Sequence, residues 1–218
     1  ENTYFEKLMR PIKLYNCDVS ICGFTVMGKN KNIVDPALCA EGIYNGESIE
    51  QLKQNYYNGY NIQNSRWTKI FDKELILSHV DELDYSITLC EDQTITVRAI
   101  LDASSIYISR TYGYYYRVND SSMSHLFNQK LLSNFEKVYV SVTQAFEKKG
   151  YMNEYVLQSF VNEAISVIGL IIYSSESIKK RVQYLQLFRN QQSVNYLFSS
   201  ETSIGIKKKW KIIQVILD

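Results

Sequence analysis

Two adjacent carboxylates, Glu91 and Asp92, are the residues of this 218-residue chain whose placement most directly allows chemistry. They stand at the start of a predicted helix, Gln93 to Ala103. One well-placed carboxylate can accept the proton of a hydroxyl group and act as a general base. The same pair would also complement the positive end of the helix macrodipole. Periodicity alone favours this second, structural interpretation.

Cationic and aromatic side chains accompany the acid pair in the sequence. Arg117 could bind phosphate or carboxylate through two hydrogen bonds, whereas Lys69 would act as a point charge. The alternative for each is an exposed or structural ion pair. Trp67 is a candidate platform for stacking a sugar ring, although a Trp among Ile and Phe neighbours is more often packed in a core.

Tyrosine is unusually frequent, with 18 copies in the chain. Tyr112, Tyr114 and Tyr116 alternate along a predicted strand and would face one side of it, with Tyr115 on the other. Tyrosines often line sites for flat or sugar-like ligands, yet ordinary cores use them more often. We therefore expect part of this ladder to belong to the core.

Cysteine and histidine show no metal-ligand spacing. His79 and His125 lack Cys or carboxylate partners at such spacing, so we predict that both are surface residues and assign no metal. The cysteines also match no redox motif, and thiols in a reducing cytoplasm are the simplest interpretation. They are Cys17, Cys22, Cys39 and Cys90.

Composition limits the class of protein. Lys and Arg number 24 against 23 Asp and Glu, so no global field attracts nucleic acid, and an electrostatic partner would need a local patch. With 45% hydrophobic residues, the chain can bury one good core or two small ones. The longest apolar stretch, Ala164 to Tyr173, is interrupted by Ser166 and Gly169 and falls short of the roughly 20 residues needed to cross a bilayer. We predict no membrane-spanning helix.

The first half of the chain predicts alternating helices and strands. Asp18 to Met27 is rich in β-branched residues and almost free of charge, which predicts a strand buried on both faces. Four further segments are expected: a helix over Thr3 to Tyr15 capped by Asn2 or Thr3, a surface excursion with a short hairpin over Gly28 to Asn45, a helix over Ser48 to Asn58 with Ser48 and Gln51 at capping-box spacing, and one or two short helices over Ser65 to Ile76 that leave Lys69 and Lys73 free.

The second half predicts three antiparallel helices that form a small bundle. They span Leu126 to Lys149, closed by Gly150, then Asn153 to Ser174, and then Glu176 to Asn190, whose buried face would be Ile178, Val182, Leu185 and Phe188. The bundle could cover a cleft, pair subunits in a homo-oligomer or rest on a membrane. The tail, Lys207 to Asp218, combines four cations with Trp210 and aliphatic residues. It suits a peripheral membrane anchor or, with nearly even weight, a segment that docks on the domain.

Four segments stand in an order that carries a family resemblance. They are Asp18 to Phe24 (DVSICGF), Trp67 to Ile76 (WTKIFDKELI), Cys90 to Asp92 (CED), and Tyr114 to Ser122 (YYYRVNDSS). In this order they resemble the acceptor half of bacterial family 2 glycosyltransferases, whose patterns read D-(I/V)-V-I-C-G-F, W-x-K-L-(Y/F)-x-(K/R)-x-L-I, E-D and Y-x-Y-R-x(4)-S. The resemblance extends over about residues 2–124.

This resemblance implies a fold and a set of roles. The fold of residues 1–124 would be α/β, a partial GT-A-like mixed sheet with flanking helices. The helices predicted from periodicity would follow it as a helical C-terminal domain over residues 125–218. Asp92 would be the base, and Glu91 would receive an acceptor hydroxyl or a backbone donor. The substrate-binding residues would be Trp67, Lys69, Tyr114, Tyr116, Arg117 and Ser122.

The sequence also departs from the family. It contains no Asp-x-Asp metal motif and no glycine-rich phosphate loop. Because the chain starts at Glu1 and runs directly into a predicted helix, we expect these parts to precede it in a longer protein. The nucleotide-sugar donor and a divalent metal, Mg or Mn, would bind there, and this chain alone would bind neither and be inactive.

The expected activity of the parent protein is inverting transfer of a sugar from a nucleotide-sugar to a glycan or lipid-linked acceptor in cell-surface polysaccharide synthesis. Such an enzyme would be cytoplasmic, with peripheral contact to the inner membrane face through the tail. The alternative is a non-catalytic binding or scaffolding domain with a membrane- or partner-docking helical C-terminus. In that case the acid pair and the tyrosines are structural.

Overall fold

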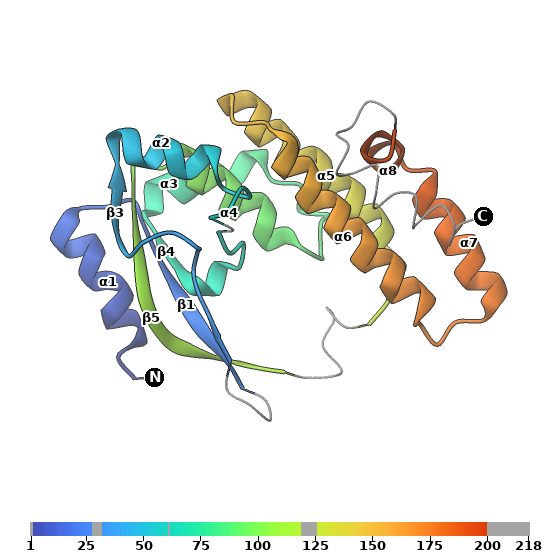
Figure 1. The fold of residues 1–218 in the computed structure, drawn as a ribbon, viewed down its shortest axis with the longest axis horizontal. Coiled ribbons are helices and arrows are strands. Elements are labelled where there is room, and N and C mark those ends of the chain that lie inside the picture. Colours follow the sequence, from blue (N-terminus) through green and yellow to red (C-terminus); the bar gives the residue numbers. More distant parts are fainter. Residues whose placement is uncertain (1, 28–31, 61, 119–125, 200–218) are drawn as a thin grey trace. The chain divides into compact units, whose positions relative to one another are not determined.

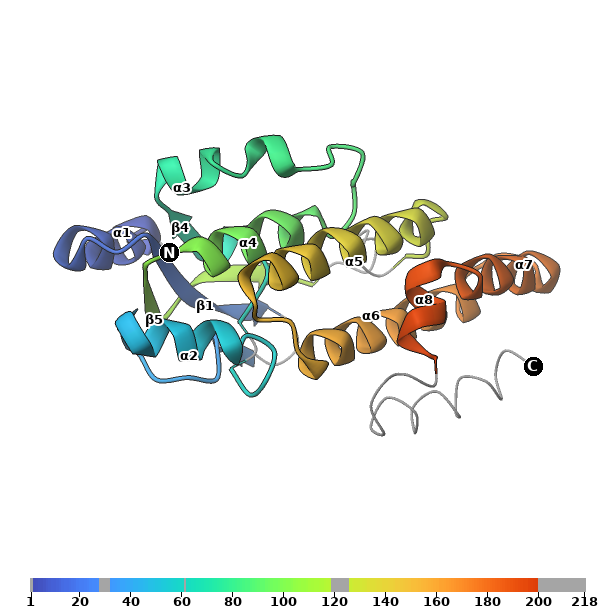
Figure 2. The same ribbon diagram turned by 90° about the horizontal axis from the view of Figure 1, so that it is seen from above.

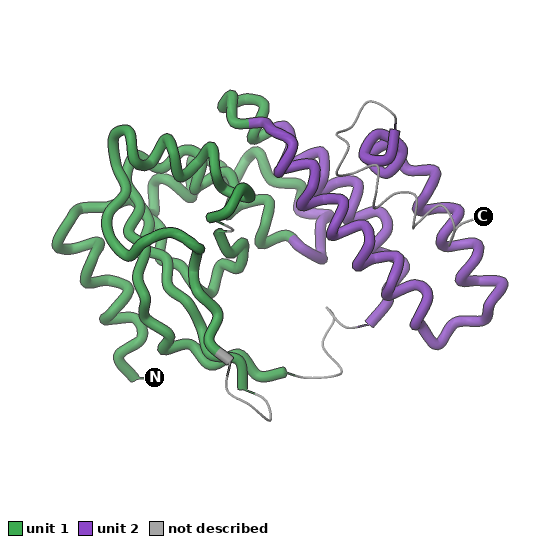
Figure 3. Tube along the Cα trace, viewed as in Figure 1, with its two compact units in different colours: residues 1–84, 91–119, 145–151 green, residues 85–90, 120–144, 152–218 purple. Residues whose placement is uncertain are grey.

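A computed structural model describes residues 2–27, 32–60, 62–118 and 126–199 of the chain, which has a mixed α/β fold (Figures 1 and 2). Ser122, His125 and the tail from Lys207 to Asp218 lie outside the described residues. Two compact units can be distinguished (Figure 3). Unit 1 contains residues 1–84, 91–119 and 145–151, and unit 2 contains residues 85–90, 120–144 and 152–218.

A mixed sheet forms the centre of unit 1. Strand β1 (Val19–Met27) pairs in parallel with β5 (Ser105–Arg117) along one edge. Along its other edge, β1 pairs antiparallel with two short strands, β2 (Asn32–Val34) and β4 (Lys69–Phe71). Strand β3 (Gly42–Asn45) pairs antiparallel with the start of β5. The predicted buried strand is confirmed, because the first five residues of β1 are all buried.

Glycine at position 23 permits a close approach within this sheet. The register between β1 and β5 shifts between Cys22 and Phe24, and the ring of Tyr112 lies against the backbone of Gly23 there. A Cβ atom at position 23 would lie 2.5 Å from the carbonyl oxygen of Val34 and 2.6 Å from the Tyr112 ring. Only glycine fits this position without movement of its neighbours.

Helix α1 (Tyr4–Tyr15) confirms the expected first helix and packs on the sheet through Tyr4 and Leu8, which contact Cys22 of β1.

Helix α2 (Gly46–Gln54) starts two residues earlier than expected. Its capping residue is Asn45, whose backbone N–H donates to Ser48 Oγ at 3.0 Å, so the predicted pairing of Ser48 with Gln51 is wrong. Two more helices of unit 1 are α3 (Lys73–Leu77) and α4 (Glu91–Asp102).

Residues 65–76 differ from their prediction as one or two short helices. They form a 3-10 turn, η1 (Arg66–Thr68), then strand β4, and then α3. A further 3-10 turn, η2 (Val80–Glu82), follows. Lys69, Ile70 and Phe71 pair with β1 in the sheet, and Lys69 is buried rather than free.

Unit 2 is helical. Its helices are α5 (Lys130–Lys149), whose residues from 145 onward belong to unit 1, α6 (Glu154–Ile172), α7 (Ile178–Arg189) and α8 (Gln192–Leu197). Gly150 closes α5 with a φ of +75°, as expected. The ring of Phe135 on α5 meets those of Phe160 on α6 and Phe188 on α7, with centroids 6.2 and 5.1 Å apart.

Helix α7 does not bury the face that its periodicity predicted. Phe188 is buried, but Ile178 is 73% exposed and Val182 is 47% exposed. The pattern i, i+4, i+7 shows which side chains share a face, whereas burial requires another element against that face. In the part of the chain that the structure describes, only the Phe188 side of this helix has such a partner.

Helix α6 corrects the prediction that no segment could cross a membrane. It is 19 residues long, and its most apolar 18-residue window has a mean hydropathy of 1.6, which is sufficient by length and composition alone. The prediction counted uninterrupted apolar residues, whereas the helix includes Ser166 and Gly169 and stays apolar on average. Of this window, 39% is buried inside the structure. A helix in the core of a protein in water can have the same length and composition.

Candidate functional site

The acid pair lies in the first turn of α4 and is engaged by Arg66 of η1. The Arg66 Nη2 atom donates to Glu91 Oε1 at 2.9 Å, and Arg66 Nε donates to Asp92 Oδ1. The backbone N–H of Arg66 points to Asp92 Oδ2 at 3.4 Å. Both oxygens of Asp92 therefore face one arginine that the sequence analysis did not select.

The backbone just before the acid pair has an unusual conformation. Cys90 has a φ of +62°, which is the left-handed region that residues other than glycine seldom adopt. This residue ends the preceding loop and directs the chain into α4. Glu91 and Asp92 remain reachable from water, with 45% and 30% of their side chains exposed.

Lys69 is buried, and its ammonium group forms hydrogen bonds with the loop that precedes it. Its Nζ donates to the carbonyl oxygens of Gln63 and Ser65, the latter at 2.8 Å, and to Thr68 Oγ1 at 3.1 Å. Burial lowers the pKa of Lys69 to about 7, while the nearby Cys22 and Asp92 act in the opposite direction. The prediction of a free Lys69 failed because the lysine closes the turn that carries Arg66 and Trp67.

Three of the predicted aromatic residues come together. The Trp67 ring stacks on Tyr114 with centroids 4.2 Å apart and planes at 24°, and on Tyr116 with centroids 5.7 Å apart and planes at 16°. Phe24 meets the Trp67 ring edge-on at 4.8 Å. Tyr112 does not join the group, because its hydroxyl donates to Asp35 at 2.6 Å.

Arg117 and the acid pair belong to different elements, since Arg117 is in the sheet and the acids begin α4. It is the last residue of β5, is exposed, and pairs in register with Met27 at the end of β1. Tyr116 lies next to it in the chain and contacts Trp67, so Arg117 is connected to the site through that tyrosine.

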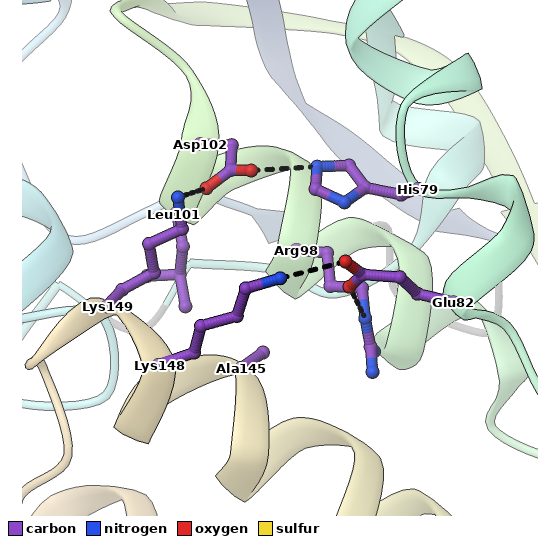
Figure 4. Close-up of a pocket in the computed structure, with 8 residues that line it drawn as sticks. All are labelled: His79, Glu82, Arg98, Leu101, Asp102, Ala145, Lys148 and Lys149. Carbon is purple, nitrogen blue, oxygen red and sulfur yellow. Dashed lines mark hydrogen bonds and ion pairs between the residues drawn. The ribbon is translucent and has the colours of Figure 1, made fainter.

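His79 is not a surface residue as predicted. It is 5% exposed and lies among charged residues of η2, α4 and the last turn of α5 (Figure 4). These elements come together only in the folded chain, so the spacing around His79 carried no signal of its burial. The residues around it are Glu82, Arg98, Leu101, Asp102, Ala145, Lys148 and Lys149.

Among the described residues, no group of three or more His, Cys, Asp or Glu side chains could hold a metal ion. The four cysteines all lie in the described part of the chain, and none forms a disulfide. Burial raises the pKa of the thiols of Cys17, Cys22 and Cys39.

Comparison with models of known protein families gives no match for this chain. A search of curated proteins also gives none.

Proposed function

We propose that this chain is the acceptor-side part of an inverting glycosyltransferase with a GT-A-like fold. The observation that carries the proposal is the turn of residues 65–69. Its Arg66 engages the acid pair of α4, and the next residue, Trp67, stacks on two tyrosines of β5. Segments selected separately from the sequence are thus joined through one short turn. A carboxylate beside an aromatic platform is an arrangement that suits a sugar hydroxyl.

In the proposed reaction, Asp92 takes the proton of the acceptor hydroxyl. The acceptor oxygen forms the new bond to the anomeric carbon, and the nucleoside diphosphate leaves with the electrons of the broken bond. Arg66 is 52% exposed, so its side chain can move aside for an acceptor at little cost. Lys69 would act as a positioning residue, because its three hydrogen bonds shape the turn. Donor and metal would bind to a part of the protein outside these residues.

The test is turnover of a nucleotide-sugar by the full-length protein carrying Asp92→Asn. We expect turnover to fall by about 100-fold or more, the usual contribution of a general base, in a variant that circular dichroism shows to be folded. The matched control is Glu74→Gln, which removes an exposed acid from the first turn of α3. Unchanged turnover in Asp92→Asn would remove the assignment of the base.

A binding measurement tests separately whether the donor site lies outside this chain. The 218-residue chain alone is expected to show no heat of binding with a nucleotide-sugar in the presence of Mg²⁺ or Mn²⁺. Binding by this chain at micromolar concentrations would contradict the placement of the donor site elsewhere.

The second candidate is a non-catalytic binding or scaffolding domain. It is favoured by the contacts of the acid pair, since both oxygens of Asp92 already face Arg66 and one face of Trp67 is covered by Tyr114. In that case Asp92→Asn lowers the free energy of unfolding and leaves the turnover of the full-length protein unchanged. The same variant therefore distinguishes the two functions.

A further inference from the structure

The buried imidazole of His79 lies in unit 1 beside five charged side chains (Figure 4). Glu82 comes from η2, Arg98 and Asp102 from α4, and Lys148 and Lys149 from the last turn of α5. Neither ring nitrogen of His79 has a hydrogen-bond partner. The adjoining cavity measures about 10 Å³, the lower limit for one water molecule. Such a buried polar group is costly and needs a physical explanation.

Each carboxylate near His79 is already neutralised by a lysine. Glu82 pairs with Lys148 at 2.9 Å and with Arg98 at 3.3 Å. Asp102 pairs with Lys149 through Oδ1, while its Oδ2 lies 3.3 Å from His79 Nε2 without the alignment of a hydrogen bond. A neutral imidazole is compatible with this arrangement, because no carboxylate is left without a cation.

A proton on His79 would disturb this balance. Burial lowers the pKa of His79, Arg98 and Lys149 act in the same direction, and Asp102 and Glu82 oppose it. The imidazolium would be largely shielded from water, because His79 is only 5% exposed. The Lys149 side chain is 38% exposed and can be solvated outside the cluster. The least costly response is for Asp102 to align with the imidazolium and for Lys149 to turn to solvent.

We propose that His79, Asp102 and Lys149 form an acid-sensitive clasp on the last turn of α5. When His79 is protonated, the carboxylate of Asp102 exchanges its ion pair with Lys149 for one with the imidazolium. The backbone of residues 145–151 then opens more often. The turn does not detach, because the Phe146 ring packs against the rings of Tyr56 and Tyr57, with centroids 5.6 and 5.8 Å apart. Of the described helices, α5 alone has residues in both units, so the clasp acts where this helix is attached in unit 1.

Hydrogen exchange of residues 145–151 tests the clasp. After correction for intrinsic exchange rates, protection is expected to fall about threefold to fivefold as the pH is lowered from 7.5 through the NMR titration midpoint of His79, which is the value of one partly exposed ion pair. His79→Gln should remove this pH dependence, and His125→Gln, which replaces the other histidine of the chain, should leave it intact. An equal pH dependence in His79→Gln would overturn the proposal.

Titration of labelled histidine by NMR gives an independent readout. His79 is expected to titrate below the ordinary value of about 6.5. Lys149→Gln should raise the midpoint, since it removes a repulsive charge and releases Asp102. Lys148→Gln is the matched control and should change it less, because Lys148 pairs with Glu82 rather than Asp102. A midpoint that does not respond to Lys149→Gln would contradict the clasp.

Discussion

Lys69 shows how a single residue can be misjudged from its neighbours in the sequence. Regularly placed cations between Trp67 and Ile76 predicted solvated side chains, yet the ammonium of Lys69 is buried against the backbone of the preceding turn. A buried cation persists only when oxygen atoms surround it, and here two carbonyls and a hydroxyl do so. The residue therefore contributes structure to a turn whose other side chains are candidates for function.

Stability should depend on pH through Lys69. Its pKa in the folded chain, about 7, lies below the ordinary value of 10.5, so the unfolded chain binds more protons between these values. The free energy of unfolding should therefore rise with pH from about 7 towards 8.5. Urea unfolding of the wild type and of Lys69→Met across this range measures the contribution. The rise should be smaller in the variant, and equal slopes would contradict this account.

Gly23 provides a second prediction for a single position. Gly23→Ala places a Cβ against a carbonyl oxygen and a tyrosine ring, and we expect a loss of about 1–3 kcal/mol of stability from overpacking. Gly169→Ala is the control, because a Cβ there meets no neighbouring atom within 4 Å and the helix should gain up to about 1 kcal/mol. Chemical denaturation of both variants tests this pair, which requires opposite signs.

At the scale of elements, the ends of helices are defined by short polar side chains. Asn153 accepts hydrogen bonds from the backbone N–H groups of Tyr155 and Val156 at the start of α6. Asp72 does the same for Glu74 and Leu75 at the start of α3. These residues satisfy donors that the first turn of a helix leaves unpaired.

The cap of α6 can be tested directly. Asn153→Ala should lower the free energy of unfolding by about 1 kcal/mol, whereas Asn153→Ser should restore most of it, because a hydroxyl can also cap. Thermal unfolding followed by circular dichroism measures the difference. If alanine and serine behave alike, the Asn153 side chain does not cap the helix.

At the scale of the whole molecule, local patterns in the sequence predicted secondary structure but not long-range contacts. The helices over residues 4–15 and 154–172 and the strand over residues 19–27 follow from periodicity and β-branched content, which are local properties. Arg66 reaches Glu91, and Lys149 reaches Asp102, across long stretches of sequence, and no local pattern encodes those contacts. The acids and aromatics of the candidate site could therefore be selected from the sequence, whereas the arginine that engages the acids could not.

Thiol reactivity reports on the whole fold at once. Cys90 is exposed and the other three cysteines are buried, so an aromatic disulfide reagent should label one thiol per native chain quickly and all four in denaturant. Cys90→Ser should abolish the fast phase. Fast labelling of more than one thiol in the native chain would show that Cys17, Cys22 or Cys39 is accessible.

The parallel pairing of β1 with β5 also governs the order in which the chain can fold during synthesis. Asp18 donates through its backbone to Ser105, 87 residues later, and Val19 pairs with Ile106. At 5–20 residues per second, β1 waits roughly 4 to 17 seconds for this neighbour to be translated. An apolar, β-branched strand with an open edge is prone to pair with other chains. The nascent protein should thus depend on chaperone protection until the ribosome has passed Arg117.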